Sequence, residues 1–269
     1  FDPARDLLKP EEMLALDRWV LNRARSLHQD IVAAYDSYSF HVIYQRLHQF
    51  CSVDLGGFYL DVLKDRVYTV RADSVARRSA QTAMYHLLET LARWMAPILS
   101  FTAEEIWRNM PGSRGASVLL ETWYTLPADL AQDELTSEVY WDKVLAVREQ
   151  VARELEKARV AGALGASLEA EVDLYVDAEL RTLLTKLGEE LRFVLITSEA
   201  RVHDLAANPS AGIETGLKGL RVQVNPSAHV KCARCWHRRA DVGANAEHPQ
   251  LCARCVTNVA GSGEVRRIA

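Results

Sequence analysis

The sequence has 269 residues, of which 49% are hydrophobic and 25% are charged. This composition is typical of a globular protein and excludes disordered, collagen-like and disulfide-dense secreted classes. The net charge of -4 is unevenly distributed along the chain. From Lys218 onward there are nine basic and only three acidic residues, so this end carries +6 and the preceding part carries -10. A basic end on an acidic body indicates either a polyanionic partner for that end or a solvated basic tail.

The sequence shows no sign of export or of membrane insertion. No apolar run approaches the roughly 18 residues that a membrane span needs. The chain begins Phe1-Asp2-Pro3, with no basic or apolar leader and no initiator methionine. We therefore expect a cytoplasmic protein and a piece of a longer polypeptide.

The first hundred or so residues are predicted to form long amphipathic helices. Apolar residues recur in steps of three and four over residues 13–35, 40–62 and 80–94, which places them on one face of each helix. Gly56-Gly57 weakens the second run and marks a close helix contact or a break. Pro97 either ends or kinks the third run. Successive helices of this kind with short joints favour an antiparallel bundle.

Single residues in this region have structural interpretations. Thr102, with Glu105 three residues later, predicts a capping box at the start of a short helix. Trp19, Trp94 and Trp107 lie on apolar stripes and are expected in the core. We also expect Cys51 to be a small buried hydrophobe.

A smaller α/β unit is predicted after the bundle. Residues 113–134 form a connector, in which 118–120 is an extended piece, and a helix covers 141–159. Alternating residues over 168–176 and 220–224 predict strands, the apolar run 193–196 is a further strand candidate, and 180–187 is a short helix. We predict a mainly α protein of three parts: a bundle over 1–126, an α/β unit over 127–225 and a lobe over 226–269.

The strongest motif is Cys232-Ala-Arg-Cys235, followed after sixteen residues by Cys252-Ala-Arg-Cys255. This spacing fits a two-knuckle zinc site, because each tight turn presents two sulfurs to one ion. Four thiolates leave no position open for water, so one structural zinc ion is predicted. A redox pair and two disulfides are the alternatives, but a redox motif is normally single and no secretory signal is present.

Residues around the knuckles are candidates for binding RNA. Trp236 follows the first knuckle beside basic side chains, a composition that stacks and clamps unpaired bases. Alternatively, Trp236 covers the knuckle as the only large hydrophobe of the lobe. The basic candidates are Lys231, Arg234, Arg238, Arg239 and Arg254.

The remaining candidates in the chain are weaker. Arg77 and Arg78, which open the third helix, either touch phosphate or form part of a solvated helix face. His229, His237 and His248 are expected on the surface. No nucleophile triad and no phosphate loop occurs, and we predict no catalytic residue.

The sequence resembles the C-terminal part of bacterial isoleucyl-tRNA synthetases, a family of class I aminoacyl-tRNA synthetases. Two stretches look like the anticodon-binding helices of that family, FHVIYQRLHQFCSVDLGGFYLDVLKDRVYT and RRSAQTAMYHLLETLARWMAPILSFTAEEIW. The stretch VREQVARELEKAR resembles its next unit, and CARCWHRR with LCARCVTNVAGSGEVRR resembles its zinc-binding terminus.

The resemblance implies tRNA recognition without catalysis. It assigns Cys232, Cys235, Cys252 and Cys255 as the zinc ligands and isoleucine tRNA as the partner of a cytoplasmic monomer. The ATP-handling signatures of the family, His-x-Gly-His and Lys-Met-Ser-Lys-Ser, occur nowhere in this chain. ATP and magnesium are therefore expected only in the catalytic part of the same polypeptide, and this part alone is predicted to catalyse nothing. The N-terminal catalytic and editing domains of that polypeptide are expected as partners of this part.

Two other functions are compatible with parts of the sequence. A DNA-repair glycosylase of the formamidopyrimidine type has a zinc finger of similar spacing, but uses an N-terminal proline, whereas this chain begins with Phe1 and a helical region. A purely structural zinc module would dock to a synthetase core without touching RNA. The size of the bundle and the basic tail favour RNA recognition over that module.

Overall fold

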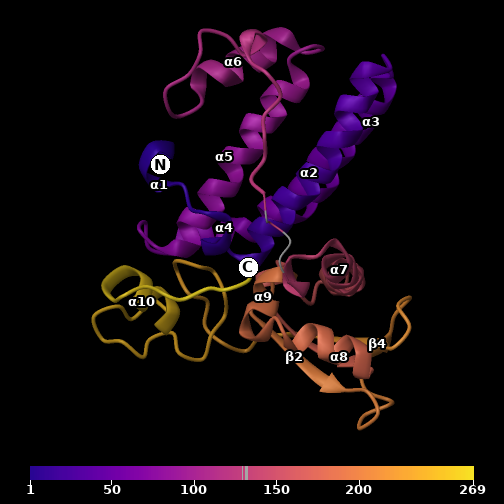
Figure 1. The fold of residues 1–269 in the computed structure, drawn as a ribbon. Helices are drawn as coiled ribbons and strands as arrows, with labels where there is room; N and C mark the ends of the chain where they lie inside the picture. Colours follow the sequence, from indigo (N-terminus) through magenta and orange to yellow (C-terminus); the bar gives the residue numbers. More distant parts are fainter. Residues whose placement is uncertain (129, 131–132) are drawn as a thin grey trace. The chain divides into compact units, whose positions relative to one another are not determined.

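The computed structural model describes residues 1–128, 130 and 133–269, which pack into two compact units (Figure 1). Unit 1 comprises Phe1–Val67 and Ala72–Ser137, and unit 2 comprises Tyr68–Arg71 and Glu138–Ala269. No helix among the described residues is long and apolar enough to cross a membrane. A helical bundle, a small α/β fold and a four-cysteine lobe are present, as predicted, whereas the boundaries at 126 and 225 stay a prediction.

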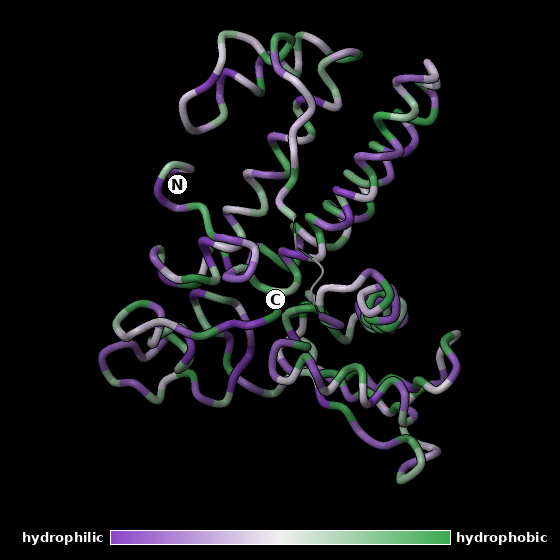
Figure 2. Tube along the Cα trace, viewed as in Figure 1, coloured by the Kyte–Doolittle hydropathy of each residue, from purple (hydrophilic) through white to green (hydrophobic). Residues whose placement is uncertain are grey.

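Unit 1 is the predicted helical bundle. Its elements are α1 (Pro3–Asp6), η1 (Pro10–Glu12), α2 (Ala15–Asp36), α3 (Phe40–Gln49), η2 (Phe50–Tyr59), α4 (Leu60–Thr69, shared with unit 2 at its end), α5 (Val75–Met95), α6 (Ser100–Asn109), η3 (Val118–Leu120) and η4 (Glu134–Thr136). Ser74 is the N-cap of α5, because its hydroxyl accepts a hydrogen bond from the backbone amide of Arg77. Helix α2 packs against both α3 and α5 (Figure 1), and hydrophobic and hydrophilic residues alternate along these helices (Figure 2).

The core of unit 1 combines large aromatic rings with one buried ion pair. Trp19, Trp94 and Trp107 are buried, as predicted. The carboxylate of Asp17 accepts hydrogen bonds from both Nη atoms of Arg66, at 2.8 and 2.6 Å, and both side chains are fully buried. Because the remaining acceptor capacity of Asp17 is filled by hydroxyl donors, this charge is paired on all sides.

The glycine pair widens a helix and does not break it. Residues Phe50–Tyr59 form η2, a π-helix continuous with α3 and α4. A Cβ atom on Gly56 would lie 3.1 Å from the carbonyl oxygen of Cys51, and one on Gly57 would lie 3.3 Å from that of Ser52. Glycine therefore leaves room for the carbonyl five residues earlier, which the wide turn brings close.

Three predictions for unit 1 were wrong. Helix α6 begins at Ser100, after Leu99, so Thr102 is not its cap. Residues 118–120 form a 3₁₀ turn, because the side chain of Ser117 caps it by accepting from the amide of Leu119. Cys51 is exposed, since the change to π-helical geometry turns it away from the apolar face.

Unit 2 is built around a mixed four-stranded sheet with the order β2-β1-β4-β3. Its elements are α7 (Glu138–Val160), η5 (Ser167–Glu169), β1 (Ala170–Val176), α8 (Ala178–Thr185), η6 (Gly188–Glu190), α9 (Leu191–Leu195), β2 (Glu199–Asp204), β3 (Ile213–Glu214), β4 (Leu220–Pro226) and α10 (Ala253–Ala260). Strand β1 pairs in parallel with β2 and antiparallel with β4. The predicted apolar face of β1 is buried, with Ala170, Val172, Leu174 and Val176 all inaccessible to solvent.

The apolar run at 193–196 is helical, so the strand predicted there is wrong. It forms the end of α9, which stops where Ile196 adopts a left-handed conformation with φ 57°. A short apolar run fits a buried helix as well as a buried strand, which is why periodicity misassigned it. The true parallel strand, β2, follows at Glu199–Asp204, where Ala200 and Val202 are the only apolar residues and all six residues are partly buried.

Candidate metal centre and nucleic-acid surface

Two separate turns bring the four motif cysteines together. Cys232 and Cys235 lie in a tight turn flanked by the bridge between Lys231 and Arg238, and the amide of Trp236 donates to the carbonyl of Cys232 at 3.0 Å. Cys252 is the N-cap of α10 and Cys255 lies in its first turn. The amide of Ala233 donates to the carbonyl of Gln250 at 3.0 Å, which ties the two turns to each other.

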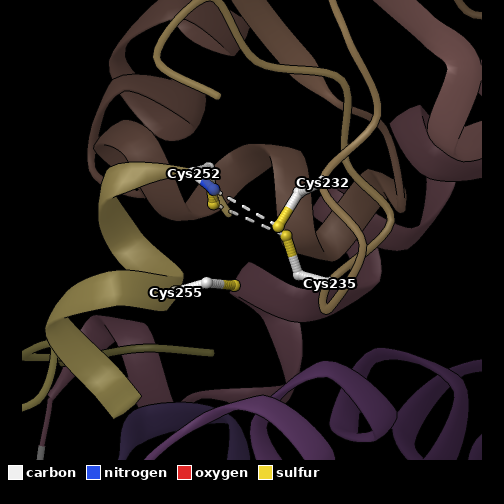
Figure 3. Close-up of side chains that lie close together, drawn as sticks. All are labelled: Cys232, Cys235, Cys252 and Cys255. Atoms are coloured by element: carbon white, nitrogen blue, oxygen red, sulfur yellow. Dashed lines mark hydrogen bonds between the residues drawn. The ribbon is translucent and has the colours of Figure 1, made fainter. Parts of the chain in front are cut away.

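The sulfur atoms form a closed, buried cluster. All four cysteines are buried, and their Sγ atoms lie within 4.8 Å of one another. Figure 3 shows the side chains pointing toward a common centre. The Sγ atoms of Cys235 and Cys252 are 3.7 Å apart, and the amide of Cys252 donates to Sγ of Cys232 at 3.4 Å.

This cluster fits a tetrahedral zinc ion. Zinc–sulfur bonds of about 2.3 Å imply sulfur–sulfur edges of about 3.8 Å in a regular tetrahedron, close to the edge between Cys235 and Cys252. Hydrogen bonds from the thiols of Cys252 and Cys255 hold the pKa of Cys235 well below its ordinary value. The same hydrogen bonds raise the pKa of Cys252 and of Cys255, so a bound metal ion must displace the protons of these two thiols.

His237 is not on the surface, contrary to the prediction. Its side chain is buried, and its ring meets that of Phe193 edge-on at a centroid distance of 5.5 Å. Its carbonyl accepts a hydrogen bond from the amide of Cys232 at 2.9 Å. His237 thus supports the first knuckle by packing, because Phe193 on α9 supplies an apolar surface that the lobe itself lacks.

Trp236 is exposed and does not close over the sulfur cluster. Its backbone is left-handed, with φ 67°, and 59% of the residue is accessible to solvent. The apolar side chains packed on the four cysteines are instead Val242 and Leu251. Lys231 places its Nζ atom 5.3 Å from the centroid of the indole ring, so the two candidates form one exposed cation–aromatic pair.

The four arginine candidates of the lobe are held by other residues of unit 2. Arg238 pairs with Glu169 at 2.9 Å and Arg239 with Glu199 at 2.6 Å. Arg254 pairs with Glu264 at 3.1 Å. These carboxylates were not anticipated as part of the site, because an ion pair between distant residues leaves no local pattern in a sequence.

The fourth arginine is held by the backbone. Arg234 donates a hydrogen bond through Nη2 to the carbonyl oxygen of Thr69 at 3.1 Å. Thr69 belongs to the segment Tyr68–Arg71, which packs with unit 2. Together, these ion pairs and hydrogen bonds engage most of the arginines that give the lobe its positive charge.

Arg77 and Arg78 lie in unit 1, at the start of α5. Arg78 donates to the side-chain oxygen of Gln81 at 2.8 Å and lies 3.2 Å from a carboxylate oxygen of Asp6. The side chain of Arg77 is half-buried. Lys231 and Trp236 therefore lie together in unit 2, whereas Arg77 and Arg78 belong to unit 1.

The comparisons with known proteins match two family models to this chain. Residues 17–174 match the family described as the anticodon-binding domain of tRNA ligase, and residues 231–258 match the zinc finger found in FPG and IleRS. An isoleucine–tRNA ligase of Thioalkalivibrio sulfidiphilus is 57% identical over 272 residues, and one of Azotobacter vinelandii is 55% identical over 269. Each alignment covers 100% of this chain but only 29% and 28% of the respective relative.

Proposed function

Because the chain belongs to the family of anticodon-binding domains of tRNA ligases, we propose that it is the tRNA-recognition part of an isoleucine–tRNA ligase. The observation that carries this proposal is the match of its whole length to isoleucine–tRNA ligases at 57% identity. Its partner is isoleucine tRNA, in the cytoplasm, and its polypeptide acts as a monomer. Amino-acid activation, with ATP and magnesium, belongs to the parts of the relatives that this chain does not span.

Within the proposal, the zinc ion has a structural role. Cys232, Cys235, Cys252 and Cys255 would hold it, and a closed set of four thiolates supplies no reactive position. The ion would stabilise the fold of the lobe, which has few large apolar side chains of its own. Its contribution to tRNA binding is to fix the first knuckle, from which Lys231 and Trp236 extend into solvent.

We assign the RNA contact of the lobe chiefly to Trp236 and Lys231. An exposed indole next to an ammonium group can stack on an unpaired base while the cation faces the RNA backbone. Arg238, Arg239 and Arg254 have carboxylate partners in the same unit. Their part in tRNA binding is therefore to position the knuckles, and any phosphate contact they make must compete with these ion pairs.

The proposal is tested by competition between two tRNAs. The chain is bound to labelled isoleucine tRNA and challenged with the unlabelled tRNA, either unchanged or carrying a different anticodon, at two salt concentrations. We expect the altered tRNA to compete poorly at both concentrations, because phosphate contacts alone are steeply salt-dependent and indifferent to sequence. Equal competition, or no binding, would identify the chain as a support that does not read the anticodon.

A DNA-repair role has less support. The zinc-finger family is found in FPG as well as in IleRS, but residues 17–174 match an anticodon-binding domain. The competition assay includes duplex DNA as a third competitor to separate these functions. Preferential displacement by duplex DNA would favour the repair role.

A further inference from the structure

We propose that Arg192 of α9 is the electrostatic counterpart of the metal centre, where its buried positive charge offsets the negative charge of four thiolates on a zinc ion. The inference rests on the proposed zinc ion and concerns a side chain that is not part of the ligand set. Four thiolates on one divalent ion carry a net negative charge. A protein interior must balance such a charge with positive groups nearby.

Arg192 is a buried cation without a carboxylate partner. Only 9% of the residue is accessible to solvent. Its Nε atom is buried without a hydrogen-bond partner, and no residue in 1–128, 130 or 133–269 forms an ion pair with its guanidinium group. Arginine keeps its proton in proteins, and an unbalanced buried charge is costly. We therefore expect a group that balances this charge in the folded protein.

The charged side chains around Arg192 do not balance it. Burial lowers the pKa of Arg192, and the positive charges of Arg239 and Arg254 lower it further, which Glu199 only partly opposes. Glu199 pairs with Arg239 at 2.6 Å, and Glu264 pairs with Arg254 at 3.1 Å. Each of these carboxylates is thus engaged by a different arginine, which leaves the surroundings of Arg192 positive.

Glu190, the acid nearest to Arg192 in sequence, is engaged by the backbone. Its carboxylate accepts hydrogen bonds from the amides of Arg267, Ile268 and Ala269, at distances between 2.7 and 3.0 Å. It forms no ion pair with Arg192 in the described part of the chain. Glu190 therefore does not supply the missing negative charge.

The ring of Phe193 brings Arg192 close to both cysteine knuckles. The guanidinium carbon of Arg192 lies 4.5 Å from the centroid of this ring, and that of Arg254, in the second knuckle, lies 5.0 Å from it. His237, beside the first knuckle, meets the same ring edge-on at 5.5 Å. Because charges in a buried region are screened little by salt, the charge of Arg192 acts on the metal centre across this ring.

The proposal predicts different effects in the two states of the lobe. A metal-free lobe either leaves Arg192 unbalanced or opens to hydrate it, so an apolar replacement is neutral or stabilising there. When zinc is bound, loss of the same positive charge leaves the thiolates without their counterpart, so the affinity for zinc falls. A side chain that only fills space would instead destabilise both states.

The test compares Arg192→Met with Arg181→Met in the full chain. Arg181 lies on α8 of the same unit, is exposed and pairs with Asp204, so its variant controls for the loss of a cation elsewhere. Competition with a chromophoric chelator measures the zinc affinity of each variant. Circular dichroism measures the melting temperature of each metal-free chain, and the absorption of bound cobalt(II) verifies that four thiolates still bind.

We expect Arg192→Met to bind zinc about tenfold more weakly, the usual loss for a group that surrounds a metal site. Its metal-free melting temperature should be no lower than that of the unaltered chain. Arg181→Met should keep the zinc affinity, and Arg192→Lys should keep most of it, because lysine retains the charge. If Arg192→Met does not fold, Arg192→Gln is compared with Arg192→Lys in the same way.

The proposal is overturned if Arg192→Met binds zinc as tightly as the unaltered chain. It is also overturned if Arg192→Lys loses as much affinity as Arg192→Met, since the shape of the side chain and not its charge would then matter. A lower melting temperature of metal-free Arg192→Met would likewise mark a packing role. Failure of the unaltered chain to bind zinc would instead reject the proposed zinc ion, so the two failures are distinguishable.

Discussion

At the residue scale, the conformation of Trp236 deserves a physical explanation. A left-handed backbone at a bulky residue costs about 1–2 kcal/mol, and here φ is 67°. The hydrogen bond from its amide to the carbonyl of Cys232 closes the knuckle turn and holds this conformation. The strained turn presents the indole to solvent, where 59% of the residue is accessible.

We expect Trp236→Ala to weaken tRNA binding by about 1–3 kcal/mol, the usual loss when a stacking aromatic is removed. Trp236→Phe should recover part of this loss, because it restores a smaller ring. Filter binding measures the affinity, and the zinc content of each variant serves as the control. Unchanged affinity of Trp236→Ala, with zinc retained, would refute base stacking by this residue.

His86 makes the stability of unit 1 dependent on pH. Burial lowers the pKa of His86 to about 4, which the charge of Glu89 only partly opposes. Its Nδ1 lies 2.6 Å from the hydroxyl of Tyr124. In the unfolded state this histidine takes up a proton near pH 6.5, whereas in the folded state it stays neutral down to about pH 4. Its contribution to the free energy of unfolding is therefore complete above pH 6.5 and decreases as the pH falls toward 4.

Between pH 7 and pH 5, this one group should cost about 2 kcal/mol of folding free energy. Urea unfolding at the two pH values measures the loss, and His86→Gln, which cannot titrate, should lose correspondingly less. Equal pH dependence in the variant and in the unaltered chain would show that other groups cause the effect.

At the scale of elements, η2 explains a glycine pair that the helical pattern leaves unexplained. In an ordinary helix interior, alanine in place of glycine adds about 1 kcal/mol of stability. At Gly56 the new Cβ would lie 3.1 Å from the carbonyl oxygen of Cys51, which is backbone and has little freedom to move.

We therefore expect Gly56→Ala to give no gain, or a loss, in the free energy of unfolding. Gly57→Ala should be milder, because its contact is 3.3 Å. Denaturant titration of both variants measures the difference. A gain of the full helical amount at Gly56 would mean that η2 rearranges easily into an α-helix.

Long periodic elements could be predicted from sequence, and contacts between distant elements could not. Helices α2, α5 and α7 and strand β1 each bury one face, so their residues repeat with a regular period. Strand β2 is half-buried throughout and carries Arg201 and His203, whose carboxylate partner, Asp173, lies on β1. Strand β2 is therefore recognisable only once its pairing with β1 is known.

The same limit applies to the candidate site. Each Cys-x-x-Cys pair is a local signal, and the burial of the four cysteines agrees with it. The ion pairs of Arg238 and Arg239 span 69 and 40 residues, so a count of basic residues overstated the free positive charge. The outward position of Trp236 depends on its φ angle, which residue types alone do not specify.

At the scale of the whole molecule, the two units should respond differently to loss of zinc. A chelator should abolish amide protection over 231–258, because the knuckles and the start of α10 depend on the sulfur cluster. Protection in α2 and α5 of unit 1 should persist. Hydrogen exchange followed by mass spectrometry measures both regions in one experiment.

Two cysteine variants provide a matched comparison for this prediction. Cys252→Ser should lose zinc and protection in the lobe, whereas Cys51→Ser should keep both, because Cys51 is exposed and lies outside the cluster. Retention of the metal and of protection in Cys252→Ser would contradict the assignment of Cys252 as a ligand.

The segment Tyr68–Arg71 cannot complete its packing until late in synthesis of the chain. It packs with unit 2, where Arg234 donates to the carbonyl of Thr69 and Arg71 donates to that of Gly261, across 165 and 190 residues of sequence. At about 5–20 residues per second, a ribosome needs roughly 10 to 40 seconds to synthesise that intervening length. During this interval the segment has emerged without these partners, so in nascent chains stalled before residue 234 proteases should cut next to Thr69 and Val70, which are buried in the finished protein.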